Sequence, residues 1–132
     1  MKAICFSIAV GILPLPALAA CQTGPFETFF REFARDIAVQ EAVVPERILV
    51  SELDPDAAPE PVLIEREVAR EELLWPLVPN LTSFERGGGS VSHDPLAEGV
   101  SVTLRGDNGY LKTLVFVQTP CWRLVSIKDE SL

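Results

Sequence analysis

The fold of this chain is decided by residues 100–127, which read VSVTLRGDNGYLKTLVFVQTPCWRLVSI. In residues 100–105, apolar side chains alternate with polar ones, which is the pattern of a strand with one buried face. The next four residues, Gly-Asp-Asn-Gly at 106–109, accept the positive φ angles of a tight hairpin turn. Further strands are indicated at 110–118 and 121–127, separated by Thr119-Pro120. The sequence therefore predicts an antiparallel meander of three strands at the C-terminal end.

An aromatic stripe predicts a helix that begins at Pro25. Its apolar residues recur at helical spacing and form one face, made of Phe26, Phe29, Phe30, Phe33 and Ile37. We expect this stripe to be the core face of a helix packed on the sheet. A ligand pocket lined by the phenylalanines is the alternative.

The middle of the chain predicts a hairpin and a short helix. Strands are indicated at 46–53 and 61–67, with a solvated turn at 54–60 between them. A helix is expected at 68–75, ended by Pro76 and buried through Leu73, Leu74 and Trp75, and 87–90 is expected to be a flexible tip.

Together the elements predict an α+β fold, with the helices packed on one face of a curved antiparallel sheet. The length allows a single domain, at residues 21–132.

The first twenty residues predict a secretory signal peptide. Met1-Lys2 is a short positive region, an apolar run follows from residue 3 to residue 13, and small residues close the segment at 17–20. The apolar run is shorter than the roughly twenty residues that a membrane-spanning helix needs. The sequence therefore predicts an exported protein without a membrane span, located in the periplasm or secreted.

Two alternatives are open at Cys21. Leu18-Ala19-Ala20-Cys21 resembles a bacterial lipobox, in which Cys21 would carry a lipid anchor and Gln22 would favour the outer membrane. Alternatively, an ordinary signal peptidase cleaves after Ala19, and Cys21 then pairs with Cys121, because two cysteines in an oxidising compartment form a disulfide by default. The processing residues are thus Ala19, Ala20, Cys21 and Cys121, and their use distinguishes a disulfide-bonded protein from an outer-membrane lipoprotein.

The charge excludes one class of partner. The formal net charge is −8, and residues 41–72 alone hold ten acidic residues against three arginines, a net charge of −7. Nucleic-acid binding needs clustered lysines and arginines, which no stretch supplies, so we predict no nucleic-acid partner.

The histidine and the cysteines do not have metal-ligand spacing, and the glycine run at 87–89 lacks the Lys-Ser/Thr of a phosphate loop. We therefore predict no metal and no cofactor.

The two ends of the domain resemble a known family. The opening is Pro25-Phe26-x-x-Phe29-Phe30-x-x-Phe33-x-x-Asp36-x-x-Val39-Gln40, and the ending is Cys121-Trp122-Arg123-Leu124-Val125-Ser126-Ile127-x-Asp129. Together they resemble an uncharacterised family of exported bacterial proteins with a nuclear-transport-factor-2-like fold. The resemblance implies an N-terminal helix across a bent sheet, a cone with a cavity, and cavity-lining positions at Phe29, Phe33, Trp122 and Leu124. It supplies no catalytic motif.

The sequence offers weak candidates for catalysis. Isomerases and dehydratases of that superfamily use Asp, His and Tyr inside the cone, and His93, Asp94, Asp107 and Tyr110 are the residues of those types here. His93 and Asp94 are sequence neighbours, which is no sign of a catalytic arrangement, and a turn and a strand account for the other two. We predict no catalytic residues and a small binding or interaction module of the cell envelope, with a protein partner or an unidentified ligand. A pocket enzyme of the isomerase or dehydratase type and a structural, homodimeric component are the alternatives.

Overall fold

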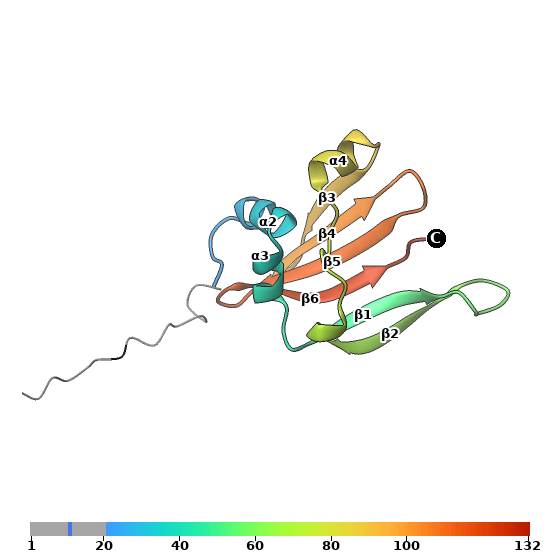
Figure 1. The fold of residues 1–132 in the computed structure, drawn as a ribbon, viewed down its shortest axis with the longest axis horizontal. Coiled ribbons are helices and arrows are strands. Elements are labelled where there is room, and N and C mark those ends of the chain that lie inside the picture. The colour runs from blue at the N-terminus through green and yellow to red at the C-terminus, as the bar shows by residue number, and fades with distance from the viewer. Residues whose placement is uncertain (1–10, 12–20) are drawn as a thin grey trace, which may run out of the picture.

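The computed structural model of the chain describes Gly11 and residues 21–132. Apart from Gly11, the predicted signal peptide, with Ala19 and Ala20, lies outside the described residues. The elements are α2 (Phe26–Arg35), α3 (Ile37–Val43), β1 (Arg47–Asp54), β2 (Val62–Ala69), a short 3-10 helix η1 (Arg70–Glu72), α4 (Leu81–Arg86), β3 (Ser90–Pro95), β4 (Gly99–Arg105), β5 (Leu111–Gln118) and β6 (Trp122–Asp129) (Figure 1). The predicted α+β class is confirmed.

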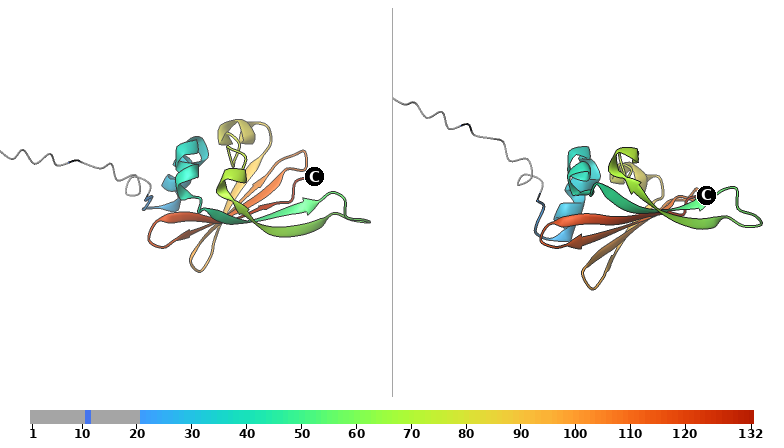
Figure 2. Two further views of the ribbon diagram at one scale, coloured as in Figure 1. Left: turned by 60° about the horizontal axis from the view of Figure 1, so that its bottom comes forward. Right: turned by 90° about the horizontal axis from the view of Figure 1, so that it is seen from below.

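The strands form one six-stranded sheet in the order β2-β1-β6-β5-β4-β3. The predicted β1–β2 hairpin and the β4–β5–β6 meander are antiparallel, as expected. The prediction of a wholly antiparallel sheet is wrong at one junction, because β1 and β6 pair in parallel. These two strands are far apart in the sequence, so no local turn sets their relative direction. In both views of Figure 2, α3 and α4 lie on the same side of the sheet, which we call the inner face.

The phenylalanine stripe is the core of the molecule, as predicted. The four rings of α2 are buried, and their centroids lie 5.1–6.0 Å from the centroid of Phe116 on β5. The predicted stripe does not continue to Ile37, whose side chain is 43% exposed. The helix is interrupted at Asp36, where the backbone is extended and the carboxylate accepts a hydrogen bond from the amide of Ala38. The new helix that begins there turns Ile37 toward solvent.

A bulge in β6 shifts the alternation of this strand by one residue, so buried residues before and after the bulge point to the same face. Leu124 pairs with Phe116, whereas Ser126 pairs with Val115, so Val125 is an extra residue in the ladder. Trp122 and Leu124 before the bulge and Ile127 after it are therefore all buried, although their spacing does not keep a period of two.

The helix predicted at 68–75 is wrong. Val68 lies opposite Ile48 in the hairpin, and the Arg70 amide donates to the Glu46 carbonyl, so strand pairing extends through this segment. Only η1 is helical, and Leu74, expected to be buried, is 87% exposed. Pairing with β1 thus outweighs the local preference for a helix. The buried apolar pair of this region is Leu77 and Val78.

Two further elements were not predicted. Helix α4 begins after Asn80, whose side chain accepts a hydrogen bond from the Ser83 amide at its N-terminus. The glycines expected only to form a tip connect α4 to β3, and Gly88 takes a φ of 96° there. Strand β3 then pairs with β4 over its whole length.

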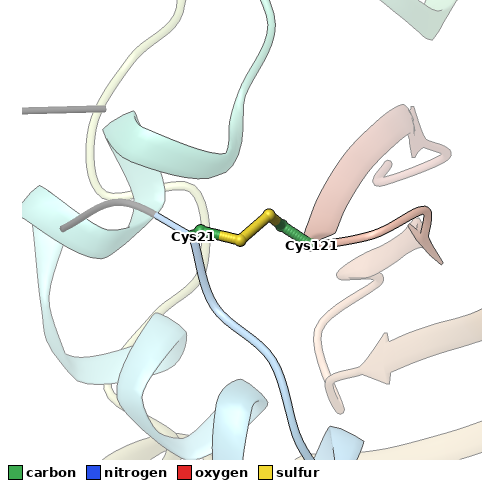
Figure 3. The surroundings of a disulfide bond; sticks show 2 residues. All are labelled: Cys21 and Cys121. Atoms are coloured by element: carbon green, nitrogen blue, oxygen red, sulfur yellow. A yellow bond between two sulfur atoms is a disulfide. The ribbon is translucent and has the colours of Figure 1, made fainter. Parts of the chain in front are cut away.

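A disulfide joins Cys21 to Cys121 across a sequence separation of 100, with 5.2 Å between the Cα atoms (Figure 3). Two hydrogen bonds strengthen this connection. The Trp122 amide donates to the Gln22 carbonyl over 2.8 Å, and the Trp122 indole donates to the Gly24 carbonyl over 2.9 Å. Of the two alternatives at Cys21, the structure contains the disulfide, and it ties the segment before α2 to the start of β6.

Candidate functional site

A hollow of about 270 Å³ opens on the inner face, between the sheet and the segment at 72–77. Strands β1, β2, β5 and β6 all contribute side chains to it. Its apolar part consists of Val50, Val68, Leu73, Leu74, Leu77 and Ile127, and its charged part of Glu52, Arg66, Glu72, Lys112 and Asp129. The hollow therefore combines an apolar floor with an ionic rim, as small-molecule sites commonly do.

Three charged residues of the rim form one row across the sheet. Asp129 on β6 lies opposite Glu52 on β1 and opposite Lys112 on β5. The next residue of the row is Leu104 on β4, which is fully buried. Because directly opposite residues share one face of a sheet, the three charged side chains continue a core row on the inner face. They are thus held at the hollow by the same register that builds the core.

Lys112 has unused hydrogen-bonding capacity at this rim. Its ammonium donates to the Leu77 carbonyl over 3.0 Å, and an ammonium has three N–H donors. In the described part of the chain, Lys112 has no carboxylate within ion-pair distance. Burial lowers the pKa of Lys112, and the negative charges of Asp129 and Glu52 partly oppose that effect. A half-buried ammonium with free donors suits a ligand atom that accepts hydrogen bonds.

The remaining rim charges lie nearer solvent. Arg66 is 3.9 Å from Glu52 in an ion pair whose side chains are both more than half exposed, so the pair contributes little to stability. Glu72 adds a third carboxylate. Across the described residues, no group of three His, Cys, Asp or Glu side chains is arranged to hold a metal ion. The chemistry that the rim offers is ionic and hydrogen-bonding contact.

The pKa of the Tyr110 hydroxyl responds to burial and to the negative charge of Asp129 in this row. Burial raises the pKa of Tyr110, and the charge of Asp129 raises it further. Because Tyr110 is the only tyrosine of the chain, tyrosinate absorbance follows it alone. We expect a midpoint above the ordinary value of about 10 in the folded protein and a partial decrease in Asp129→Asn, since burial remains.

The raised pKa has a defined effect on stability. The folded state holds the Tyr110 proton more tightly than the unfolded state does, so this group stabilises the fold below about pH 10. The stabilisation is lost as the pH rises from there through the raised pKa. Titration of the chain unfolded in urea supplies the reference, and equal midpoints for folded and unfolded protein would contradict the assignment.

The predicted cavity-lining residues lie in the core cluster. Phe29, Phe33, Trp122 and Leu124 are all buried, and the ring centroids of Phe29 and Trp122 are 5.8 Å apart in a stacked arrangement. None of the four is among the residues that line the inner-face hollow. Their role as the lining of a cavity stays a prediction.

The structure does not bring the four candidate catalytic residues together. His93 on β3 lies edge-on to Phe26 and Phe30, with ring centroids 5.3 and 5.2 Å away. Its neighbour Asp94 points to the opposite face of the strand, as consecutive strand residues do. Asp107 lies in the β4–β5 turn, and Tyr110 packs edge-on against Phe84. These groups form no shared constellation.

Comparison with known proteins finds no matching family model and no matching curated protein. A solved structure of an NTF2-like protein from Bacteroides fragilis shares the arrangement, with a TM-score of 0.61 and 21% sequence identity. The chain has an NTF2-like fold. The match covers 83% of this chain and 48% of the solved one, so this chain spans about half the length of that protein. The NTF2-like fold implied by the sequence resemblance is thereby confirmed.

The rim of this NTF2-like sheet was not singled out from the sequence, although a signal for it exists. Each of the three charged residues in the row lies two positions along its strand from a buried residue. Glu52 follows Val50, Lys112 precedes Leu114, and Asp129 follows Ile127. A charged side chain in phase with the core points to the inner face. The alternation of the strands therefore predicts the positions of Glu52, Lys112 and Asp129 without any sequence motif.

Proposed function

We propose that the chain is a small exported binding module and that the inner-face hollow of its NTF2-like fold binds a small molecule. The observation that carries the proposal is Lys112, a half-buried ammonium at an apolar hollow with one protein acceptor. Placing a charge there costs desolvation free energy, which a bound acceptor would offset. The alternatives of a pocket enzyme and of a structural, homodimeric component stay predictions.

The hollow sets limits on the ligand. At about 270 Å³ it matches the low end of small-molecule sites, so the ligand is small. The apolar floor favours an aliphatic or aromatic body. The head must accept a hydrogen bond from Lys112 while lying near the carboxylates of Glu52 and Asp129. A neutral carbonyl or hydroxyl, or a zwitterion, meets both conditions better than a free anion, which the carboxylates would repel.

Export and a bonded Cys21 belong to the same proposal. Disulfides persist in oxidising compartments outside the bacterial cytosol, and a sulfur bonded to Cys121 is not available for a lipid thioether. No helix among the described residues is long and apolar enough to cross a membrane. Intact mass of the protein recovered from its host separates the two states of Cys21, because the disulfide removes two hydrogens and acylation adds acyl chains.

The ligand site is tested with two lysine variants that carry the same change. A thermal-shift screen of small neutral and zwitterionic molecules with apolar bodies supplies hits, and calorimetric titration supplies their affinities. We expect Lys112→Met to weaken the binding of a hit about tenfold or more, because a hydrogen bond from a charged group is lost. Lys128→Met is the matched control, since Lys128 is exposed and lies on the opposite face of the neighbouring strand.

Two results would contradict the proposal. A screen without a binder would remove the evidence for a small-molecule site. A binder with equal affinity for the Lys112→Met and Lys128→Met proteins would place the ligand elsewhere. Circular dichroism of both variants shows whether each retains the fold.

A further inference from the structure

The β1–β2 hairpin extends beyond the helices and forms one end of the sheet (Figures 1 and 2). Strand β2 is the last strand in the sheet order, so in the described part of the chain it pairs only with β1. Its other edge presents backbone N–H and C=O groups without strand partners, and such an edge can accept an added strand. Arg66 and Val68 of this strand line the inner-face hollow proposed above as the ligand site, whereas residues 62–64 do not.

The free edge is apolar over consecutive residues. Val62, Leu63 and Ile64 are 56%, 42% and 47% exposed. Val62 and Ile64 share the inner face with the buried Val68, whereas Leu63 shares the outer face with Glu65 and Glu67. An added strand would therefore meet Val62, Ile64 and the Glu52-paired Arg66 on the inner face, and mainly carboxylates on the outer face.

The hairpin also carries surplus negative charge. Residues 46–67 contain seven acidic residues and two arginines, a net charge of −5. Both arginines already lie beside glutamates across the strands: Arg47 is 3.0 Å from Glu67 and Arg66 is 3.9 Å from Glu52. The remaining five carboxylates have no ion-pair partner among the described residues, and they are Glu46, Asp54, Asp56, Glu60 and Glu65.

We propose that the free edge of β2 receives an extended basic segment of a partner protein as an added strand. The alternation along β2 specifies that segment: lysine or arginine at the position beside Glu65, whose carboxylate has no ion-pair partner among the described residues, and apolar side chains at the positions beside Val62 and Ile64. A second copy of this chain fits less well, because it would bring the same carboxylates to the shared edge. Anionic lipid is repelled by the same charge.

The test uses a fluorescent peptide of alternating lysine and valine, with its affinity for the full domain measured by anisotropy. We expect saturable binding that weakens at least tenfold in the double variant Glu60→Lys/Glu65→Lys, which reverses two hairpin carboxylates without ion-pair partners among the described residues, and that weakens as salt is added. The matched control is Glu27→Lys/Glu85→Lys, which makes the same change of charge at exposed positions on α2 and α4. It should bind the peptide much more tightly than the hairpin variant does.

Further peptides separate strand addition from mere charge attraction. A peptide N-methylated at every residue has no backbone N–H to donate along either edge, so it should lose binding, and a glutamate–valine peptide should not bind. Equal affinity of the N-methylated peptide, or of the two double variants, would overturn the proposal. So would binding of the protein to neutral phosphatidylcholine vesicles in place of the peptide. Since Lys112 lies outside this edge, Lys112→Met should bind the peptide normally, which keeps this result independent of the ligand site.

Discussion

Removal of the disulfide in Cys21→Ser/Cys121→Ser is expected to lower the free energy of unfolding by about 4–5 kcal/mol. The bond joins residues 100 positions apart, so it constrains nearly the whole domain in the unfolded state, where a longer loop loses more entropy. A domain of this size has a total stability of about 5–15 kcal/mol, so the loss is a large share of it. Urea unfolding followed by circular dichroism measures the difference.

The reduced natural protein is the control for this variant. Reduction and the double serine replacement remove the same constraint, so both should unfold at the same, lower urea concentration. Trp122 fluorescence, measured in a Trp75→Phe background because the chain has two tryptophans, tests the local consequence, since two hydrogen bonds of Trp122 hold the segment at 22–24 beside the disulfide. If the oxidised and reduced proteins unfold at the same urea concentration, the bond contributes nothing and the expectation is contradicted.

Local patterns in the sequence predicted the parts of the fold that local contacts build. The alternation at 100–105 places Val102 and Leu104 in the core, and the Gly-Asp-Asn-Gly turn joins β4 to β5 as expected. The spacing of the phenylalanines likewise predicted the buried face of α2. In each case one turn or one helix fixes which side chains lie together, so a short window of sequence contains the information.

Contacts between distant segments could not be predicted in the same way. The parallel pairing of β1 with β6 joins Leu49 to Ser126, and nothing near either residue sets the direction. The candidate site depends on that pairing, because Glu52 and Lys112 both meet Asp129 only in the assembled sheet. Cys21 shows the same dependence, since a lipobox and a disulfide partner are both readable from sequence, whereas the contact between Cys21 and Cys121 exists only in the folded chain.

Phe33→Ala is expected to lower the free energy of unfolding by about 3–5 kcal/mol. The Phe33 side chain is fully buried, and its ring centroid lies 5.1 Å from that of Phe116 and 5.9 Å from that of Phe30. Loss of the ring leaves a cavity between α2 and β5, which the sheet cannot close because β5 pairs on both edges.

A milder variant and a surface control keep the Phe33 measurement interpretable. Phe33→Leu should cost less than about 1.5 kcal/mol, because it retains most of the apolar volume, and it remains measurable if Phe33→Ala does not fold.

Ile37→Ala is the control: an unbroken stripe would make Ile37 as costly to truncate as a core residue. The break at Asp36 leaves Ile37 43% exposed, so we expect a change of no more than about 0.5 kcal/mol. A loss at Ile37 as large as that at Phe33, measured by urea unfolding, would favour the continuous helix over the observed break at Asp36.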